Sequence, residues 1–265
     1  VGDAYMKTVI HPYKEISLNA AQYIAEFGGK HDTQWADKRR PATRCPACYA
    51  PMKLVGEDRP VHDPFFSHIG NSSEQPVFCP LRTSTTDFRY AFLRDPPHNP
   101  TAGEAIKRSF FKNWTKHFSM IRKHLDGMFD VQQFIQLIHI GNESRLWNRG
   151  NLSEWEIPYI FLVWQDYPPI KDKRTGKYVR REWYKFWFDY RVRTLEDIWI
   201  RTQGKPRIIR ATYSIPRDGS SPGIDQLRDT KVFDLNENFL LSNYEPKVHD
   251  YVKKCMAREF PNFIP

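Results

Sequence analysis

The sequence predicts an α+β protein with an N-terminal zinc ribbon, a basic helical segment and a C-terminal domain built on a mixed or antiparallel sheet. Three observations support this prediction. Three cysteines and a histidine are spaced for one metal ion, an apolar stripe of helical period follows them, and strand-like runs occupy the C-terminal half. Hydrophobic residues make up 40% and aromatic residues 15% of the 265 residues, which is enough for a packed interior.

Changes in composition predict the domain boundaries. Residues 1–5 precede the first Met and resemble a vector scar, so they are left out of the fold argument. A stretch rich in Thr and Ser up to residue 86, and one rich in Pro at 96–100, are expected to be loop or linker. We therefore expect a lead-in at 6–40, the zinc ribbon at 41–95, the basic helical segment at 101–141 and the C-terminal α+β domain at 150–265.

The charge balance favours an anionic partner. The formal net charge is +9, and phosphate contacts made by Lys and Arg release condensed counterions, so nucleic acid is the expected partner, with DNA favoured. No run approaches the ~18 apolar residues of a membrane span, and no signal-peptide pattern is present. Clustered cysteines are typical of metal binding in a reducing compartment. These features predict a cytoplasmic protein without a membrane partner.

The metal-ligand pattern begins with a CPAC knuckle. Cys45 and Cys48 are separated by two residues, which lets both thiolates point at one cation. His68 and Cys79 would complete the set, in a spacing of Cys-x2-Cys-x19-His-x10-Cys. Four protein ligands leave no position open for water, so the expected ion is a structural zinc rather than a catalytic one.

Other interpretations of these residues stay open. The CxxC pair is also found in redox sites, although the βαβ pattern of a thioredoxin-like site is absent around it. A second alternative is that the cysteines are buried thiols without a ligand role. His62 is an alternative ligand to His68. We favour His68 because Phe65–His68 is predicted to be a short strand that delivers the imidazole beside an apolar pair.

The run from Cys45 to Cys79 resembles the zinc ribbon of the CoiA-like competence-protein family. The shared features are the CPAC knuckle, the apolar arm Met52–Leu54 and the phrase Phe66–His68, and the similarity covers roughly residues 30–115. The resemblance implies DNA processing, because such ribbons usually precede a Glu-Ser-x-x-His phrase and a restriction-endonuclease-like domain. This chain departs there. Across residues 97–107 it has a His, a Glu and a Lys in a different order and spacing, so the nuclease motif is not evident.

Helical periodicity predicts several helices. A short one is expected at Asn19–Phe27, capped by Asn19 and ended by Gly28-Gly29. Thr101, with Glu104 three residues later, predicts a capping box at the start of a long helix. The apolar stripe of that helix comprises Ile106, Phe110, Trp114, Phe118, Ile121 and Leu125.

The opposite face of this long helix is cationic, with no acid between Glu104 and Asp126. Such a face repels itself unless an anion lies nearby, so it is a candidate nucleic-acid site, with a solvated surface helix as the alternative. Its cations are Lys107, Arg108, Lys112, Lys116, Arg122 and Lys123.

Farther along the chain we expect helices and strands in alternation. The predicted helices are Val131–Ile140, ended by Gly141-Asn142, then Thr194–Ile200 and a tail within Pro246–Phe260; the predicted strands are Pro158–Trp164, Tyr184–Val192 and Pro206–Ser214. Between the first two strands, Lys171–Arg181 is rich in Lys and Arg around Thr175-Gly176, which is typical of a basic hairpin. Its candidate nucleic-acid contacts are Lys173, Arg174, Lys177 and Arg180.

The sequence also offers candidates for a catalytic site. A restriction-type nuclease needs an Asp on one strand and an acid-x-Lys pair on the next, converging on Mg²⁺ or Mn²⁺. Glu154 and Glu156 precede the first predicted strand, and the further candidates are Asp166, Lys185, Asp189 and Arg191. Arg191 stands where Lys is expected and cannot readily relay a proton. Glycine patterns of nucleotide-binding loops are absent from the sequence, and residues 219–223 are expected to be a flexible loop.

The sequence therefore predicts a zinc-ribbon protein that binds nucleic acid as an accessory or recognition factor in DNA processing or defence. One alternative is a divergent metal-dependent nuclease of the CoiA-like type. The other is a protein–protein adaptor, in which the ribbon and exposed aromatic residues hold a larger assembly together.

Overall fold

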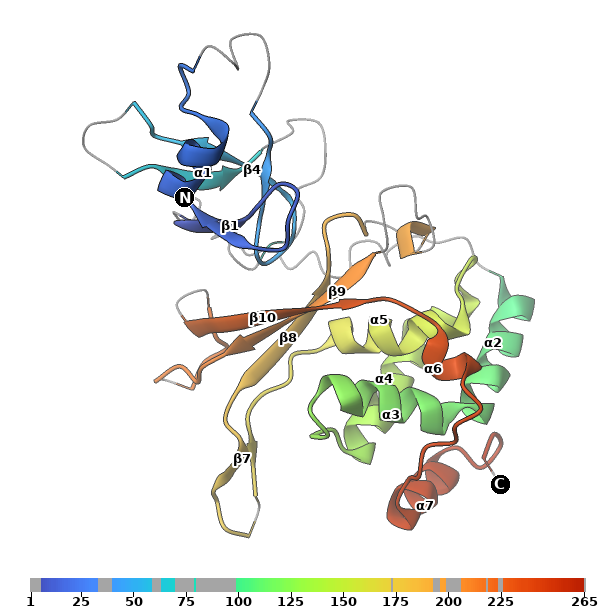
Figure 1. Ribbon diagram of the computed structural model, residues 1–265. Coiled ribbons are helices and arrows are strands. Elements are labelled where there is room, and N and C mark those ends of the chain that lie inside the picture. The colour runs from blue at the N-terminus through green and yellow to red at the C-terminus, as the bar shows by residue number, and fades with distance from the viewer. Residues whose placement is uncertain are drawn as a thin grey trace. The chain divides into compact units, whose positions relative to one another are not determined.

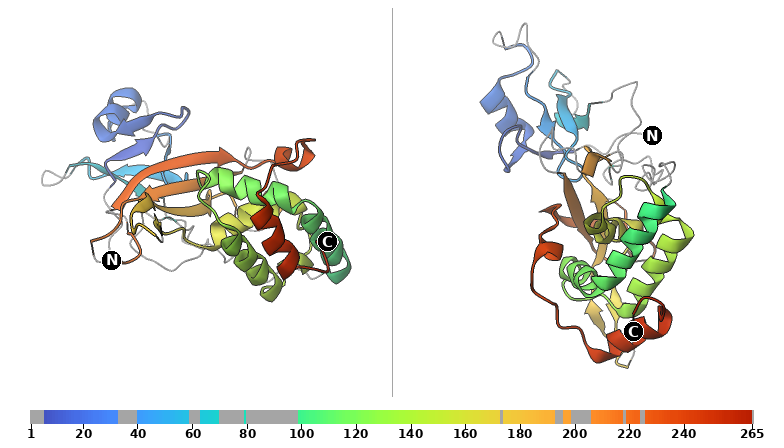
Figure 2. Two further views of the ribbon diagram at one scale, coloured as in Figure 1. Left: turned by 90° about the horizontal axis from the view of Figure 1, so that it is seen from below. Right: turned by 90° about the vertical axis from the view of Figure 1, so that its right-hand side faces the viewer.

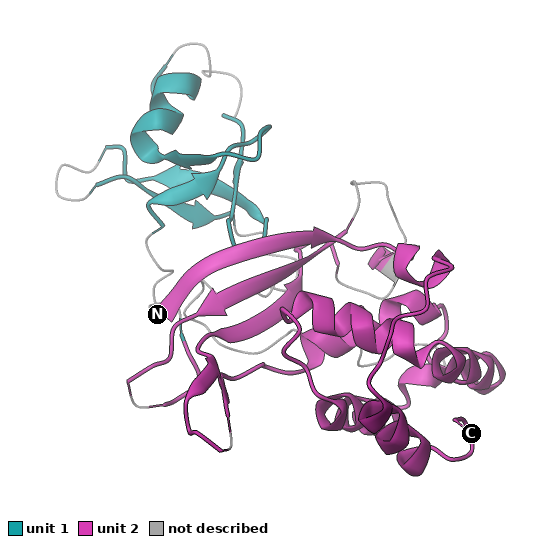
Figure 3. Ribbon diagram, turned by 60° about the horizontal axis from the view of Figure 1, so that its bottom comes forward, with its two compact units in different colours: residues 1–88, 223–225 teal, residues 89–222, 226–265 magenta. Residues whose placement is uncertain are grey.

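The structure is a computed structural model, shown in Figure 1 and from two further sides in Figure 2. It describes residues 6–32, 40–58, 63–69, 79, 99–172, 174–192, 196–198, 206–217, 219–223 and 226–264. Helices and antiparallel sheets are mixed, as an α+β protein requires. The chain divides into an N-terminal unit, residues 1–88 and 223–225, and a larger unit, residues 89–222 and 226–265 (Figure 3). In the described part of the chain, no helix combines the length and apolar character that crossing a bilayer demands.

The N-terminal unit is built on a five-stranded antiparallel sheet of order β2-β1-β3-β4-β5. The strands are β1 (Thr8–Ile10), β2 (Ser17–Asn19), β3 (Thr43–Arg44), β4 (Pro51–Val55) and β5 (Phe65–His68). The stretch expected to be a lead-in thus supplies two strands of the sheet and helix α1 (Ala20–Phe27). The predicted strand at Phe65–His68 is confirmed as β5.

Helix α1 forms as predicted. The Asn19 side chain accepts a hydrogen bond from the backbone N of Gln22, and the Gln22 side chain accepts one from the backbone N of Asn19, both at 2.9 Å. This capping box satisfies two amides that have no partner inside the helix. Gly28 ends the helix with φ 75°, a value that favours glycine. The helix buries Tyr23 and Phe27.

The larger unit packs helices against a three-stranded antiparallel sheet of order β10-β9-β8, and Figure 2 shows the helices gathered to one side of that sheet. Its strands are β8 (Trp183–Phe188), β9 (Arg207–Tyr213) and β10 (Leu227–Asp234), and a separate hairpin joins β6 (Ile170–Lys171) to β7 (Tyr178–Arg180). Its α-helices are α2 (Pro100–Lys112), α3 (Trp114–His124), α4 (Val131–Glu143), α5 (Ile157–Trp164), α6 (Asn238–Leu241) and α7 (Asp250–Glu259). Short 3-10 helices are η3 (Leu146–Asn148), η4 (Glu154–Glu156) and η5 (Glu196–Ile198).

The long helix predicted from Thr101 is wrong in two respects. It begins at Pro100, and its N-cap is Asn99, whose side chain accepts from the backbone N of Ala102 at 3.1 Å. Proline is well placed there, because its missing N–H falls among the unpaired amides of the first turn. The helix also breaks at Asn113 into α2 and α3. The Asn113 side chain donates to Glu154 at 2.9 Å, so a tertiary contact holds the break.

The strand predicted at Pro158–Trp164 is instead helix α5. Every residue of Ile157–Val163 is buried, so the segment has no polar face and its apolar run cannot reveal a helical period. Pro158 lies in the first turn, where a helix tolerates proline. Helix α4 was also expected to end at Gly141 but continues to Glu143, and Gly141 instead lets the rings of Phe161 and Trp147 approach.

One apolar core joins the helices and the sheet of the larger unit. It runs from Phe110 on α2 through Phe161 on α5 to Phe186 on β8, all fully buried. The ring of Phe110 lies within 6.0 Å, centroid to centroid, of five other rings: Phe111, His117, Phe134, Trp147 and Phe161. The basic helical segment and the C-terminal domain, predicted as separate, therefore share one interior.

The remaining strand and helix predictions are confirmed in some cases and only in part in others. β8 covers the first part of the predicted strand Tyr184–Val192, β9 confirms the strand within Pro206–Ser214, and α7 confirms a helix in the tail. β10 was not predicted, because its alternation of charged and apolar residues is irregular. Of the predicted helix Thr194–Ile200, the described residues form η5, and its expected cap Thr194 lies outside them.

Candidate metal centre

The CPAC knuckle is a tight turn between β3 and β4. The backbone N of Cys45 donates to the carbonyl of Ala50 and that of Tyr49 donates to the carbonyl of Cys45, each at 2.9 Å. The backbone N of Ala47 points at the Cys45 sulfur at 3.4 Å. Tyr49 closes the turn with φ 62°, a left-handed conformation that tyrosine seldom adopts. The turn therefore fixes both sulfurs on one side of the backbone.

The second pair of ligands comes from elsewhere in the N-terminal unit. His68 ends β5, and the β4–β5 register sets it opposite Met52, next to the knuckle. Cys79 completes a group in which one ligand atom from each residue lies within 4.8 Å of every other, and all four residues are buried. The alternative ligand, His62, lies outside the described residues. The structure thus brings together the four residues named from the spacing.

The distances suit tetrahedral coordination. The sulfurs of Cys45 and Cys79 are 3.7 Å apart, and the Cys48 sulfur is 3.3 Å from Nε2 of His68. A tetrahedron with metal–sulfur bonds of ~2.3 Å has sulfur–sulfur edges of about 3.8 Å. A disulfide would need about 2.05 Å, and all three cysteines are free thiols. The group could therefore hold one metal ion.

Electrostatics within the cluster also favour a bound cation. Burial opposes ionisation of the Cys45 thiol, but hydrogen bonds with Cys48, Cys79 and His68 hold its pKa well below the usual value. Burial, together with the nearby Cys45 and Cys79 sulfurs, raises the pKa of the Cys48 thiol well above its usual value. Three buried sulfurs at this spacing can all ionise only if a cation offsets their charge. With four protein ligands such an ion has a structural role.

The knuckle is attached to the first hairpin by Arg44. Its guanidinium donates to the carbonyl of His11 at 2.9 Å and to that of Lys14 at 2.7 Å, and it lies 5.6 Å over the ring of Tyr49. The His11 ring is itself fixed. Its Nδ1 accepts from two backbone amides, which leaves Nε2 to donate to Glu26 at 2.8 Å. These contacts order the first hairpin and the Cys/His cluster together.

The predicted cationic helix face is divided in the structure. Lys107 is half-buried with its ammonium 5.2 Å over the ring of Phe263, Arg108 is exposed and pairs with Glu104 at 3.2 Å, and Lys112 is exposed. Lys116 is buried and donates to the carbonyls of Leu240 and Ser242 at 3.1 and 2.8 Å. Lys116 was therefore wrongly placed on a solvent-facing surface, because its partners lie more than a hundred residues away along the chain.

The predicted basic hairpin forms, with one change in role. Arg174 and Lys177 are exposed near its tip, and Lys173 lies outside the described residues. Arg180 is buried and donates to the carbonyls of Met128 and Pro168 at 3.3 and 2.6 Å. Arg180 therefore anchors the base of the hairpin rather than offering its charge to a ligand.

The four catalytic candidates form two separate pairs. Lys185 lies 3.2 Å from Asp166, whereas Asp189 is buried against Arg191 and accepts from the backbone N of Arg207. Lys185 and Asp189 are four residues apart along β8 and its continuation, which separates them by about 13 Å. Among the described residues, the Cys45 cluster is the one group of three or more His, Cys, Asp or Glu side chains close enough to share an ion.

The two glutamates considered before α5 also have other partners. Glu154 accepts from Ser109, from Asn113 at 2.9 Å and from Nε2 of His117 at 2.9 Å, so it links α2 and α3 to η4. Burial raises the pKa of the Glu156 carboxyl to about 8, and one of its oxygens accepts from the backbone N of Ser153. Both residues act in packing.

The structure also contains a feature that was not predicted. A pocket of about 900 Å³ in the larger unit takes its walls from α3, α5, β9, β10, α6 and the loop after α6, segments that are far apart in the sequence. Its lysines and aromatic rings carry no local motif, so the only advance signal was the excess of basic and aromatic residues. Comparison with known proteins gives no matching family model and no similar curated protein or solved structure.

Proposed function

We propose that this is a zinc-ribbon protein that binds nucleic acid, with DNA as the favoured partner. The observation that supports the zinc assignment is the buried group of Cys45, Cys48, His68 and Cys79 at tetrahedral spacing. Thiolate and imidazole ligands in this number suit Zn²⁺ better than Mg²⁺, Ca²⁺ or Mn²⁺, which prefer oxygen. Free thiols in a metal site also fit a reducing cytoplasm.

The basic hairpin supports the nucleic-acid proposal. Lys171, Arg174, Lys177 and Arg181 are exposed on it, and Figure 1 shows it extending beyond the sheet of the larger unit. Its turn is ordered, because the Asp172 carboxylate accepts from the backbone N of Arg174 at 2.9 Å and of Thr175 at 2.7 Å. A two-stranded ribbon is narrow enough to enter the major groove of DNA.

The family context remains part of the proposal. The ribbon region resembles that of CoiA-like proteins, and the net charge of +9 fits a nucleic-acid partner. We therefore propose a role as an accessory or recognition factor in DNA processing or defence.

The zinc assignment is tested by metal analysis of the purified chain. We expect one zinc per chain, lost in Cys48→Ala and retained in Cys255→Ala. Cys255 is a suitable control because it is also a buried free thiol but lies in the larger unit. Absence of stoichiometric metal from the unaltered chain, or equal loss in both variants, would contradict the assignment.

Nucleic-acid binding is tested by titrating labelled duplex and single-stranded DNA at two salt concentrations. We expect affinity to fall steeply with salt, and the double variant Arg174→Glu, Lys177→Glu to weaken binding by about tenfold or more. Lys247→Glu, Lys254→Glu is the matched control, since it reverses two exposed charges away from the hairpin.

The same titration separates the alternatives. If the unaltered chain binds neither form of DNA at low salt, the proposal fails and the protein–protein adaptor is favoured. Cleavage of the DNA that appears only with Mg²⁺ or Mn²⁺ and is lost in Asp189→Ala would instead favour the nuclease.

A further inference from the structure

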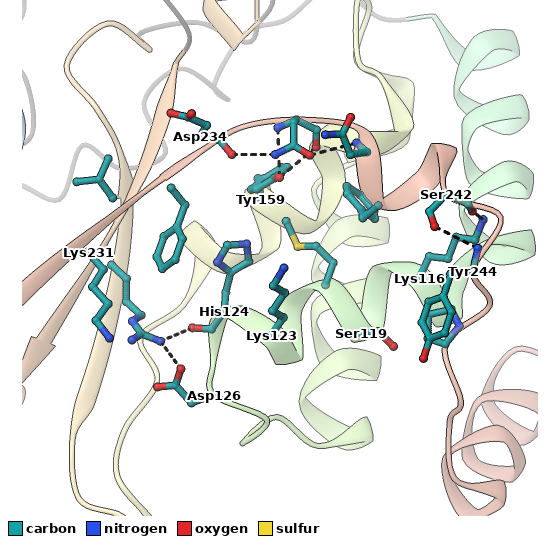
Figure 4. Close-up of a pocket in the computed structure, with 18 residues that line it drawn as sticks. Lys116, Ser119, Lys123, His124, Asp126, Tyr159, Lys231, Asp234, Ser242 and Tyr244 are labelled. Atoms are coloured by element: carbon teal, nitrogen blue, oxygen red, sulfur yellow. Dashed lines mark hydrogen bonds and ion pairs between the residues drawn. The ribbon is translucent and has the colours of Figure 1, made fainter.

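The pocket of the larger unit combines aromatic rings with positive charge (Figure 4). It has a volume of about 900 Å³, within the usual range for small-molecule sites. The aromatic side chains that line it are His124, Tyr159, Phe233, Phe239 and Tyr244, and the basic ones are Lys116, Lys123, Arg210 and Lys231. Two carboxylates, Asp126 and Asp234, share the lining with these four cations.

The lining carboxylates already have basic partners. Asp126 accepts from Arg210 at 3.0 Å and from the Tyr184 hydroxyl at 2.8 Å. Asp234 lies 3.5 Å from Arg207, which is outside the lining. The positive charge of the pocket is therefore only partly offset within it.

Two of the lysines are available to a ligand. Lys123 on α3 and Lys231 on β10 are both exposed, and neither makes an ion pair or hydrogen bond with a residue that the structure describes. In the view of Figure 4 they stand on the two sides of His124. Two exposed lysines that line one cavity from different elements can offer their ammonium groups to the oxygens of a phosphate group.

The other two cations belong to the walls. The Lys116 ammonium donates hydrogen bonds to the carbonyls of Leu240 and Ser242, so it holds the α6 segment against α3. Arg210 is 3% exposed, donates to the carbonyl of His124 at 2.7 Å, and stacks 4.5 Å over the ring of Tyr184. Both contribute positive potential without needing to move when a ligand enters.

The rings offer stacking surfaces. Tyr244 is 67% exposed although it lines the pocket, and Figure 4 shows it at the end of the cavity near Lys116 and Ser119. Phe233 is held in place by the edge-to-face contact of its ring with His124 at 4.6 Å. An exposed tyrosine beside a cationic cavity can stack on a base, because every nucleobase presents a π-face.

We propose that this pocket binds one unpaired nucleotide, with its base stacked on Tyr244 and its phosphate between Lys123 and Lys231. The proposal deepens the proposed function and rests on it for the source of the ligand, a nucleotide of a single strand. A base within a duplex is covered by its neighbours, so it enters such a pocket only when it is unpaired. The same chemistry would accept a free mononucleotide, and the experiment separates the two sources.

The test is a calorimetric titration of the full chain with dAMP, dGMP, dCMP and dTMP, together with anisotropy measurements on single-stranded and duplex DNA oligonucleotides. The variants are Lys123→Gln, Lys231→Gln as a pair and Tyr244→Ala alone. We expect each variant to weaken single-strand and mononucleotide binding by about tenfold, because each removes a phosphate contact or a stacking surface. Duplex binding should change much less.

Two controls match these changes. Arg228→Gln removes an exposed charge from β10, and Tyr251→Ala removes an exposed ring from α7; neither residue lines the pocket. Both should bind nucleotides as the unaltered chain does. Stronger binding of single strands than of mononucleotides identifies the strand as the source, and the reverse identifies a free nucleotide.

The outcomes distinguish this inference from the proposed function. If DNA binds in a salt-dependent manner but the pocket variants behave like their controls, the pocket proposal is overturned and the proposed function stands. If DNA does not bind but mononucleotides do, and Tyr244→Ala weakens them, the pocket stands and the proposed function fails. Absence of binding by any nucleotide or oligonucleotide overturns both.

Discussion

The two units of this chain obtain their packed interiors in different ways. The N-terminal unit has strands of two to five residues, and four of its buried side chains are the candidate metal ligands. The larger unit has a continuous apolar core that spans helices and sheet and includes many fully buried aromatic rings. Small sheets bury too little apolar surface to be stable alone, and a metal ion held by these four residues would compensate for this. With a metal ion bound, stability would be concentrated at one centre in the first unit, whereas it is distributed over the core of the second.

The largest effect should come from the metal centre. Cys48→Ala removes one ligand, and we expect the N-terminal unit to lose on the order of 5 kcal/mol or more, because metal binding and folding are coupled in such modules. Scanning calorimetry should then show the transition of this unit lost while that of the larger unit is unchanged. Cys255→Ala should leave the first transition in place. A single transition that shifts equally in both variants would contradict separate stabilisation.

The distributed core should respond to truncation of a central ring. Phe110→Ala removes a fully buried ring that contacts five others, and the expected loss is about 3–5 kcal/mol from the larger unit alone. Denaturant unfolding followed together with metal content should show the loss of stability with zinc retained. Leu241→Ala, at a side chain that is 69% exposed, should change stability by less than about 0.5 kcal/mol.

Replacing a buried carboxyl in the larger unit should increase the stability of the protein. Burial raises the pKa of Glu156 to about 8 from a usual 4.5, so the folded state keeps it protonated at neutral pH. The unfolded chain ionises more readily, so stability is full below about pH 4.5 and falls as the pH rises to about 8. Glu156→Gln should remove this loss and stabilise the protein by about 3 kcal/mol at pH 7.

The pH dependence sharpens that prediction. The advantage of Glu156→Gln should vanish near pH 4.5, grow as the pH rises, and level off above about pH 8. Denaturant midpoints of the two proteins across this range provide the measurement. A constant difference at all pH values would show that the carboxyl does not titrate in this way.

The smallest effect contrasts two buried glycines. A Cβ added at Gly103 would lie 2.6 Å from Oδ1 of Asn148 and 2.7 Å from the carbonyl of Trp147, so α2 and η3 would have to separate. We expect Gly103→Ala to cost about 1–3 kcal/mol. Gly141→Ala adds a Cβ at an ordinary 3.5 Å from Phe161 and should change stability by less than about 1 kcal/mol, since alanine favours the helix. Equal effects would show that the close approach of α2 to η3 is relaxed in solution.

The features that the sequence predicted correctly depend on local chemistry. The knuckle fixes Cys45 and Cys48 within one turn, and His68 follows on β5, the strand paired with β4. The cap at Asn19 and the hairpin around Gly176 likewise depend on hydrogen bonds between residues that are close in sequence. Such features need little knowledge of the rest of the chain.

The errors arise where distant segments decide the outcome. Helix α5 is buried on all sides, which removes the periodicity that identifies a helix. Arg180 lies in a basic run that is typical of nucleic-acid contacts, yet its guanidinium donates to the carbonyls of Met128 and Pro168. The pocket was invisible in the sequence for the same reason, since Lys123 and Tyr244 meet only in the folded unit. Charge composition alone does not tell which cations remain available.

The attachment made by Lys116 has a consequence for the order in which the protein takes shape during synthesis. Its ammonium group binds carbonyls 124 and 126 residues farther along the chain. Leu240 and Ser242 leave the ribosome only after helices α2 to α5 have emerged, so this wall of the pocket forms after the others. Until then the Lys116 ammonium lacks these two carbonyl partners, and a chain terminated before Leu240 would lack them permanently.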